Sequence, residues 1–283
     1  MDTFYLGIGA PRCGTSWLYA NIRDAVPDLY LPPVKELRYF GGRRSETEKK
    51  ATLSGRGAQP SIDPRDNAFF ERWEQTKDGD IDAYLSLFPE TGKVGEISPI
   101  YCTLAPDKVA EVKKLFGSRP VKVFFMIRNP YRREVSHVIF SMHRNKKRTN
   151  PYALKKYLEH VERKNFGLRS NYARAVKLWQ NEFGSDFHIF YYDDLAKDPE
   201  AFFEHFASTM GLEYNKEALQ TRSINTSGHK SDYAVKLPTA LLTHLAQRNL
   251  KRVKRMEFLP EEYRKAWIAD IEAQLAPDKA KAA

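Results

Sequence analysis

The sequence predicts an α/β protein in which a central parallel sheet is flanked by helices. Two observations support this fold class. Four short apolar runs, of which residues 121–127 are the most continuous, indicate buried strands. Segments with apolar residues at helical spacing separate these runs, and strands that alternate with helices favour a parallel, doubly wound sheet.

The first strand is expected at residues 4–8, where a glycine-containing turn leads into a helix over 15–25. Further strands are expected at 94–97, 121–127 and 187–192. Further helices are expected at 106–116, 130–143, 168–183, 199–210 and 240–255. The strand, turn and helix at the N-terminus form the opening of a βαβ unit.

Neither an internal repeat nor a linker divides the 283 residues, so one domain over residues 1–283 is predicted. Residues 41–68 interrupt the alternation, because they are polar and rich in glycine, proline, serine and charge. We predict a mobile loop there. Residues 276–283 are predicted to be a frayed tail.

Composition limits the partners and the compartment. The formal charge of +10 favours an anionic ligand, substrate or surface. Cys13 and Cys102 form neither a disulfide framework nor a metal-binding pattern. No apolar run is long enough for a membrane span, and the first residues lack the features of a signal peptide. These observations predict a cytoplasmic protein.

The turn after the first strand, GAPRCGTS over residues 9–16, carries the features of a phosphate site. Its glycines let backbone amides turn toward an anion, and the following helix adds its positive N-terminus. Nucleotide triphosphatases have lysine where this chain has Thr15, and here Arg12 supplies the cation. We therefore predict a P-loop-like, three-layer fold that is not built for triphosphate hydrolysis. The alternative is a turn that binds nothing.

A second basic motif, RNPYRREVS over residues 128–136, follows the most apolar strand. Arg128 lies at the strand end and Ser136 lies two turns into the next helix. Both are expected to face one ligand at the carboxyl edge of the sheet, where doubly wound folds bind nucleotides. An ordinary exposed helix start is the alternative interpretation.

These two motifs, in this order, resemble those of the sulfotransferases that use 3′-phosphoadenosine 5′-phosphosulfate (PAPS), and the resemblance spans residues 5 to about 230. It implies PAPS as donor, 3′,5′-adenosine bisphosphate (PAP) as product, and no metal. The implied 5′-phosphosulfate contacts are Arg12, Cys13, Gly14, Thr15, Ser16 and Trp17. Arg128 and Ser136 are implied for the 3′-phosphate, and Lys230 for a loop that closes over the nucleotide.

The resemblance also assigns Arg12 to the bridging oxygen and the sulfuryl group. Arginine keeps its charge, so Arg12 stabilises charge there without donating a proton. Within the second motif, Arg132 or Arg133 is expected to support the site or to pair with Glu134.

The catalytic carboxylate is predicted in the segment KELRYF, residues 35–40. It resembles the Glu-x-x-Phe/Tyr-Phe element of the heparan sulfate and bacterial carbohydrate sulfotransferase branch, where the glutamate is the base. This resemblance implies Glu36 as catalytic base and Lys35 as an electrostatic helper, with Arg12 as the third catalytic residue. A segment near Glu96 and Ser98 resembles the same branch and is expected to shape the acceptor site. A charged turn without a catalytic role is the alternative.

The function predicted is therefore transfer of a sulfuryl group from PAPS to a hydroxyl or amine of a carbohydrate or small-molecule alcohol. The main alternative is a P-loop small-molecule kinase that uses ATP and magnesium. A third class, a non-catalytic nucleotide- or RNA-binding protein, rests on basic runs at 143–151 and 248–255. Because no aromatic-rich nucleic-acid motif accompanies these runs, a nucleic-acid partner is not expected. The sequence implies no particular oligomeric state.

Overall fold

The computed structural model describes residues 2–41, 64–75, 80–143, 152–220 and 236–276. These residues form one five-stranded sheet with the strand order β2-β3-β1-β4-β5, in which all neighbouring strands are parallel. The strands are β1 (Thr3–Gly9), β2 (Leu29–Tyr30), β3 (Lys93–Ile97), β4 (Val121–Ile127) and β5 (Phe187–Tyr191). The predicted α/β class and the central parallel sheet are confirmed. The two-residue strand β2 was not predicted.

The register of β1 explains why the first motif is central. Phe4 pairs with Val94 of β3 on one side and with Val121 of β4 on the other. The apolar side chains of β1 are fully buried, as expected for a strand covered on both faces. The loop after β1 therefore emerges between the carboxyl ends of two neighbouring strands.

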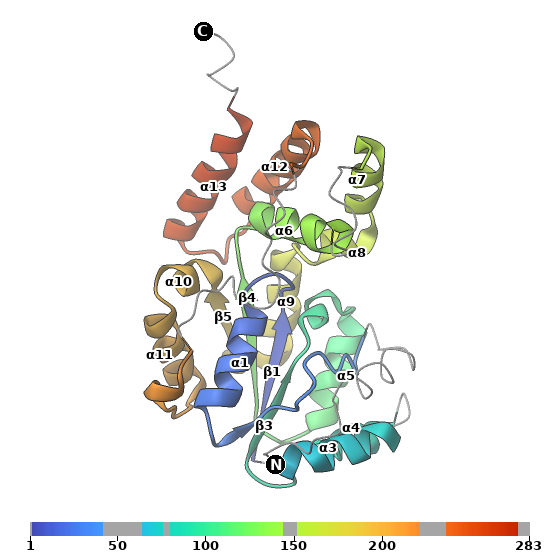
Figure 1. The fold of residues 1–283 in the computed structure, drawn as a ribbon, viewed down its shortest axis with the longest axis vertical. Coiled ribbons are helices and arrows are strands. Elements are labelled where there is room, and N and C mark those ends of the chain that lie inside the picture. Colours follow the sequence, from blue (N-terminus) through green and yellow to red (C-terminus); the bar gives the residue numbers. More distant parts are fainter. Residues whose placement is uncertain (1, 42–63, 76–79, 144–151, 221–235, 277–283) are drawn as a thin grey trace.

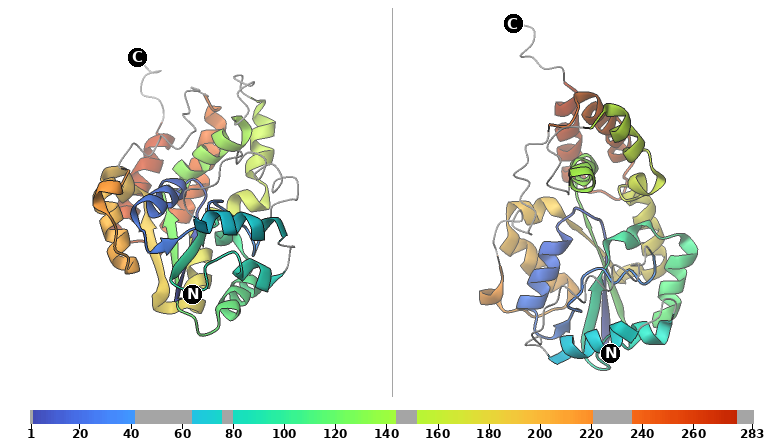
Figure 2. Two further views of the ribbon diagram at one scale, coloured as in Figure 1. Left: turned by 60° about the horizontal axis from the view of Figure 1, so that its bottom comes forward. Right: turned by 45° about the vertical axis from the view of Figure 1, so that its right-hand side comes forward.

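Helices cover both faces of the sheet, with α1 in front and α9 behind in Figure 1; Figure 2 shows the same layers from two other sides. The helices are α1 (Thr15–Ala25), α3 (Pro64–Gln75), α4 (Ile81–Leu85), α5 (Pro106–Phe116), α6 (Pro130–His143), α7 (Leu154–Val161), α8 (Lys164–Leu168), α9 (Tyr172–Phe183), α10 (Tyr192–Lys197), α11 (Pro199–Met210), α12 (Thr239–Lys254) and α13 (Glu261–Leu275). Short 3₁₀ turns occupy Pro99–Thr103, Gly184–Asp186 and Lys216–Ala218.

The predicted bounds of α1, α5, α6 and α11 agree with the structure, and α12 lies within one residue of its prediction. The helix expected over 168–183 begins at Tyr172 instead, because the side chain of Asn171 caps a new helix there. The predicted mobile loop over 41–68 is too long, since residues 64–68 belong to α3. Burial of Phe69 and Trp73 anchors that helix. Residues 42–63 and 277–283, which carry the rest of the loop and nearly all of the predicted tail, lie outside the described residues.

The C-terminal helices α12 and α13 stand with α6 above the carboxyl ends of the strands (Figure 1). The sequence predicted α12 but not α13. Within the described part of the chain, no helix combines the length and apolar character needed to cross a membrane.

Candidate functional site

The two sequence motifs meet above the carboxyl edge of the sheet (Figure 1). Residues 10–14 connect β1 to α1, and Arg128 and Asn129 connect β4 to α6. Because β1 and β4 are neighbouring strands, the two connections lie side by side. In open parallel sheets, ligands bind at this edge.

Gly14 shapes the start of α1. It has the left-handed φ of 82°, and a Cβ atom there would lie 2.6 Å from Leu195 Cδ2. Both constraints require glycine. Glycine has no side chain to cap the first amides of α1, and an uncapped helix N-terminus carries partial positive charge. This end of α1 is suited to an anionic group.

Arg12 joins the two motifs directly. Its Nε donates a hydrogen bond of 3.1 Å to Ser136 Oγ, and its guanidinium lies 4.6 Å from the centre of the Phe140 ring. Burial lowers the pKa of Arg12, and the positive charge of nearby Arg128 lowers it further. The structure thus brings Arg12, Arg128 and Ser136 to one place.

Lys35 brings a cation to the same loop from a different segment. Its Nζ donates to Thr15 Oγ1 at 3.1 Å and to Ser16 Oγ at 3.2 Å, in the first turn of α1. The side chain of Lys35 is only 16% exposed, and burial lowers its pKa from 10.5 to about 8. The glycine-containing loop has no lysine of its own, but Lys35 of a later segment places its ammonium next to the loop.

The carboxylate of Glu36 lies between two cations. Arg38 donates to Glu36 Oε2 from Nε at 3.1 Å and from Nη2 at 2.6 Å, and Lys35 Nζ lies 3.6 Å from Glu36 Oε1. The backbone of this segment is held against the end of β3, because Glu36 N donates to Ile97 O and Arg38 N donates to Ser98 Oγ. The carboxylate is thus fixed beside the glycine-containing loop.

Backbone strain is concentrated at the same residues. Among the described residues, the non-glycine residues with positive φ are Arg12 (72°), Glu36 (64°) and Arg38 (59°). Such conformations cost about 1–3 kcal/mol each and cluster at functional sites, where the surrounding structure enforces them. The hydrogen bonds around Arg12, Glu36 and Arg38 are the enforcing contacts. This coincidence marks the site independently of any sequence motif.

Glu96 supports the site from below. It is 2% exposed, accepts hydrogen bonds of 2.7 Å from both Tyr84 and Tyr101, and accepts one of 2.8 Å from Ser98 Oγ. Burial raises the pKa of Glu96, although these hydrogen bonds act in the opposite direction. Glu96 and Ser98 are both buried, and Ser98 Oγ accepts from Arg38 N, so the pair holds the segment that carries Arg38. That they shape the acceptor site stays a prediction.

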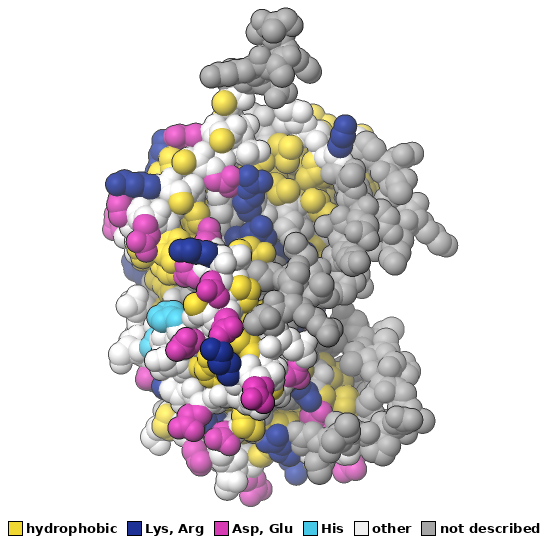
Figure 3. Space-filling model, turned by 60° about the vertical axis from the view of Figure 1, so that its left-hand side comes forward, with side chains coloured by type: hydrophobic (Ala, Val, Ile, Leu, Met, Phe, Trp, Pro, Cys, Tyr) yellow, Lys and Arg dark blue, Asp and Glu magenta, His cyan; other side chains and the backbone are white. Residues whose placement is uncertain are grey.

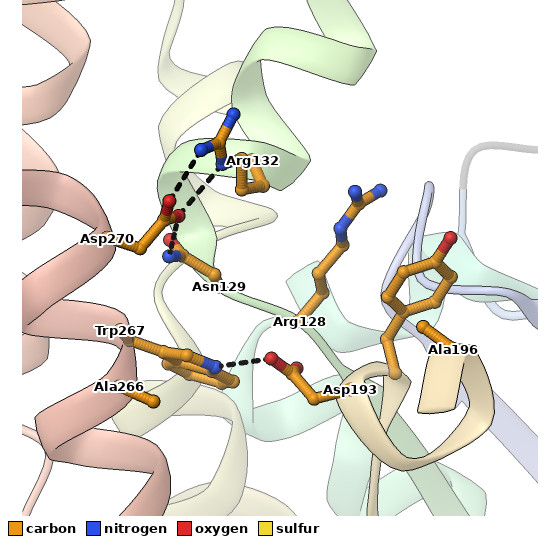
Figure 4. A pocket seen from close by; sticks show the side chains of 9 residues that line it. Arg128, Asn129, Arg132, Asp193, Ala196, Ala266, Trp267 and Asp270 are labelled. Atoms are coloured by element: carbon orange, nitrogen blue, oxygen red, sulfur yellow. Dashed lines mark hydrogen bonds and ion pairs between the residues drawn. The ribbon is translucent and has the colours of Figure 1, made fainter. Parts of the chain in front are cut away.

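A pocket of about 350 Å³ opens beside Arg128 (Figure 4). The guanidinium of Arg128 lies 4.2 Å from the centre of the Tyr192 ring, and both residues line the pocket. Trp267 and Asp270 of α13 line the opposite wall. The volume lies at the lower end of the range for small-molecule sites.

The contribution of α13 was not predicted. Asp270 accepts a hydrogen bond of 2.8 Å from Asn129 Nδ2 and another of 2.8 Å from Arg132 Nε (Figure 4). Trp267 Nε1 donates to Asp193 Oδ1 at 3.0 Å. Trp267 lies 74 residues further along the chain than Asp193. Only the tertiary structure brings the two together.

Arg132 and Arg133 have separate roles. Arg132 pairs with Asp270, as described above. Arg133 is fully buried, donates from Nε to Ser170 Oγ at 2.6 Å, and has Nη2 3.7 Å from Glu134 Oε1. Arg133 therefore belongs to the packing behind the site and not to its surface.

Two residues predicted as ligand contacts, Cys13 and Trp17, have buried side chains. The Cys13 thiol is buried 3.8 Å from the Tyr172 hydroxyl, and burial raises its pKa to about 11. The indole of Trp17 packs in the core against Phe202 and other aromatic rings of α11. The side chains of Cys13 and Trp17 thus belong to the core, and contact of these two residues with the 5′-phosphosulfate stays a prediction. Lys230 lies outside the described residues.

The assembled site combines a helix N-terminus, several cations and one carboxylate. Arg12, Lys35 and Arg128 can hold a ligand that carries phosphate groups at two positions. Glu36 can accept a proton beside them. Within the described residues, no group of three His, Cys, Asp or Glu side chains is arranged to hold a metal ion.

Comparison with known proteins identifies relatives. The profile of the Sulfotransferase family matches residues 6–216. A sulfotransferase from Alicyclobacillus acidocaldarius is similar in structure, with a TM-score of 0.59 and 20% identity over 96% of this chain and 98% of that one. The sulfotransferase domain of the Synechococcus PCC 7002 olefin synthase aligns with a TM-score of 0.49 and 18% identity over 98% of this chain and 94% of that domain. Mouse sulfotransferase SULT7A1, complexed with PAP, aligns with a TM-score of 0.38 and 13% identity over 83% of this chain and 70% of that one. No curated protein sequence matches the chain.

Proposed function

Since this chain belongs to the sulfotransferase family, we propose that it transfers a sulfuryl group from PAPS to a hydroxyl or amine of an acceptor and releases PAP. The observation that carries the proposal is the 3.1 Å hydrogen bond from Arg12 Nε to Ser136 Oγ. It joins the loop after β1 to the basic motif after β4. One nucleotide with a phosphate group at each end contacts both.

In this proposal the first turn of α1 holds the 5′-phosphosulfate. The amides near Gly14, the hydroxyls of Thr15 and Ser16, and the cations Arg12 and Lys35 all lie there. Arg128 and Ser136 hold the 3′-phosphate. The pocket between Tyr192 and α13 receives the adenosine end, because an aromatic ring and an indole provide apolar walls beside Arg128.

Sulfuryl transfer needs alignment of the acceptor, cations around the equatorial oxygens and a base for the acceptor proton. We assign the base to Glu36, whose Oε1 lies on the Lys35 side while Arg38 holds Oε2. The two bonds from Arg38 fix the orientation of the carboxylate. The acceptor oxygen or nitrogen then approaches the sulfuryl group from the side of Glu36.

For the acceptor, we propose a sugar or a small alcohol. The segment 35–40, whose pattern resembles that of carbohydrate sulfotransferases, carries Tyr39 and Phe40 shortly after Glu36 in the sequence. Tyr39 stacks on Tyr84 with ring centres 4.3 Å apart, and Phe40 packs edge-on against it at 5.4 Å. Aromatic rings in the segment that carries the proposed base suit the apolar face of a small polyol.

Two features argue against the alternatives. In a P-loop kinase the loop hydroxyl binds magnesium, whereas here Lys35 donates to both Thr15 and Ser16. A nucleic-acid surface needs clustered basic residues. Arg248 and Arg252 of the basic run 248–255 are instead paired with Glu134, and on the one face shown in Figure 3 acidic side chains lie among the basic ones.

Thermal denaturation with ligands tests the proposal. PAP at a hundred times its dissociation constant is expected to stabilise the protein by about 2.7 kcal/mol without magnesium. At the same PAP concentration, Arg12→Ala should reduce this stabilisation to about 1.3 kcal/mol or less. Stabilisation only by magnesium–ATP would instead identify a kinase, and salt-sensitive RNA binding without an effect of PAP would identify the third class.

The role of Glu36 is tested by Glu36→Gln. PAP affinity measured by calorimetry should stay close to that of the wild type, because Glu36 is not a phosphate contact. Acceptor sulfation, followed with radiolabelled PAPS in a screen of sugars and alcohols, should fall about 10²–10⁴-fold. A fully active Glu36→Gln enzyme would place the base elsewhere.

A further inference from the structure

The loop after β1 presents no side chain that can donate a proton to the leaving group, because the Cys13 thiol is buried in the core. Its cation is Arg12, and a guanidinium remains protonated in proteins. Arg12 is moreover engaged with Ser136 at 3.1 Å and with the face of Phe140. Arg12 can stabilise charge on the donor, but it cannot supply the proton that the departing phosphate oxygen takes up.

Lys35 reaches this loop from the segment that carries Glu36. Its ammonium donates to Thr15 Oγ1 and Ser16 Oγ, which lie in the first turn of α1. An anion bound at that helix end lies next to both hydroxyls. Lys35 Nζ is therefore next to the bound phosphosulfate, and it lies 3.6 Å from Glu36 Oε1.

We propose that Lys35 is the general acid of the reaction, which rests on the sulfotransferase function proposed above. A bond forms between the acceptor atom and sulfur while the bond from sulfur to the bridging oxygen breaks. The electron pair of the broken bond stays on the phosphate oxygen, which takes a proton from Lys35 Nζ. The acceptor proton passes to Glu36.

The proximity of Lys35 and Glu36 also resets the enzyme. After transfer, Lys35 is a neutral amine and Glu36 is a carboxylic acid, with 3.6 Å between their polar atoms. Transfer of the proton from Glu36 to Lys35 restores both starting states. The net reaction moves the acceptor proton to PAP, so no further acid, base or cofactor is required.

The surroundings of Lys35 bring its acidity into a useful range. Burial lowers its pKa to about 8, the charge of Glu36 acts in the opposite direction, and Arg38 and Arg12 lower it further. A lysine with this pKa is mostly protonated at pH 7 and is a much stronger acid than an exposed lysine. The rate should therefore fall as the pH rises through about 8, because the proton that the leaving group needs has been lost.

If Lys35 acted only through its charge, an arginine in its place would keep the activity. The variant Lys35→Arg therefore separates a general acid from a purely electrostatic helper. Arginine keeps the charge beside Thr15 and Ser16 but cannot donate the proton. The readout is release of PAP from PAPS with water as acceptor, which requires no knowledge of the natural acceptor. We expect PAP affinity by calorimetry within about threefold of wild type and PAP release reduced by about 10² or more. The decline in rate near pH 8 should disappear.

Lys35→Ala provides a second test that does not depend on fitting an arginine. Added methylammonium should restore PAP release in this variant, whereas added guanidinium should not. The matched control is Lys108→Arg, a substitution at an exposed lysine of α5 that pairs with Glu111, and it should behave as wild type.

Wild-type activity in Lys35→Arg with the decline near pH 8 retained would overturn the assignment, as would equal rescue of Lys35→Ala by both cations. Failure of the proposed function is distinguishable from these outcomes. In that case the wild-type protein itself would neither bind PAP nor release it from PAPS, and the role of Lys35 would fall with it.

Discussion

Replacing Glu134 by glutamine is expected to destabilise the protein by about 3–5 kcal/mol. The Glu134 side chain is fully buried and accepts hydrogen bonds from Arg248 at 2.8 Å, Arg252 at 2.7 Å and Asn249 at 2.7 Å. Arg133, equally buried, lies 3.7 Å away. Glutamine preserves the shape but removes the counter-charge, which leaves a buried arginine without a compensating carboxylate.

Urea denaturation measures this effect. With a loss of about 4 kcal/mol and a slope of roughly 3 kcal/mol per molar urea, the midpoint should fall by about 1.3 M. The matched control is Glu111→Gln, which breaks an exposed pair with Lys108 and should cost at most about 1 kcal/mol. A Glu134→Gln midpoint as close to wild type as that of Glu111→Gln would show that the buried carboxylate contributes no more to stability than the exposed one.

The same carboxylate makes a pH prediction. Burial acts to raise the pKa of Glu134, but the charges of Arg133, Arg248 and Arg252 outweigh it, so the pKa is lowered. A lowered carboxylate pKa stabilises the folded state above the unfolded value, about 4.3, and this stability is lost as the pH falls further. Stability measured between pH 6 and pH 3 should therefore fall less steeply in Glu134→Gln than in wild type.

Three further substitutions and labelling experiments test individual contacts. Arg128→Ala should weaken PAP binding by about 1.5–3 kcal/mol in calorimetry, the value of a hydrogen bond to a charged group. The melting temperature of the ligand-free protein should not fall, because the charges of Arg128 and Arg12 repel each other. Gly14→Ala should lower both the free energy of unfolding and the PAP affinity, because the new Cβ would lie 2.6 Å from Leu195 Cδ2. The control is Gly92→Ala, where φ is also positive (83°) but no atom lies near the new Cβ. It should show only the cost of the backbone conformation, about 1–3 kcal/mol. Cys13 and Cys102 should resist labelling by iodoacetamide at pH 8 in the folded protein, because burial raises their pKa values to about 11 and about 12. Rapid labelling would show that the core around these thiols opens.

The parts of the fold that the sequence predicted share a local signal. Apolar runs such as 121–127 and helices that begin at proline, such as α6, are recognisable from neighbouring residues alone. The helix α13 lacks that signal, because its apolar residues are spread around the helix and only Trp267 and Ile271 are buried. The strand order β2-β3-β1-β4-β5 likewise depends on packing between distant segments.

The residues of the candidate site also fall into those that a sequence motif identified and those that only the tertiary structure identified. Arg12, Lys35 and Ser136 were named from motifs, and the structure brings all three to the start of α1 or beside it. Asp270 and Trp267 could not be named, because a lone aspartate or tryptophan on a helix has no distinguishing pattern. A motif does not reveal which of its side chains are buried. Trp17 lies in the first motif, yet its indole is part of the core.

The cations of the candidate site repel one another, and this repulsion predicts a specific response to anions. Arg128 lowers the pKa of Arg12, which means that the two charges repel each other, and Lys35 is affected by Arg38 and Arg12 in the same direction. An anion between them relieves this repulsion. A few millimolar inorganic phosphate should therefore raise the melting temperature of the wild-type protein more than sodium chloride of equal ionic strength, which only screens charge. Arg128→Ala should reduce that difference and Glu111→Gln should preserve it; equal responses to the two salts in the wild type would show that the cations do not act on a common ligand.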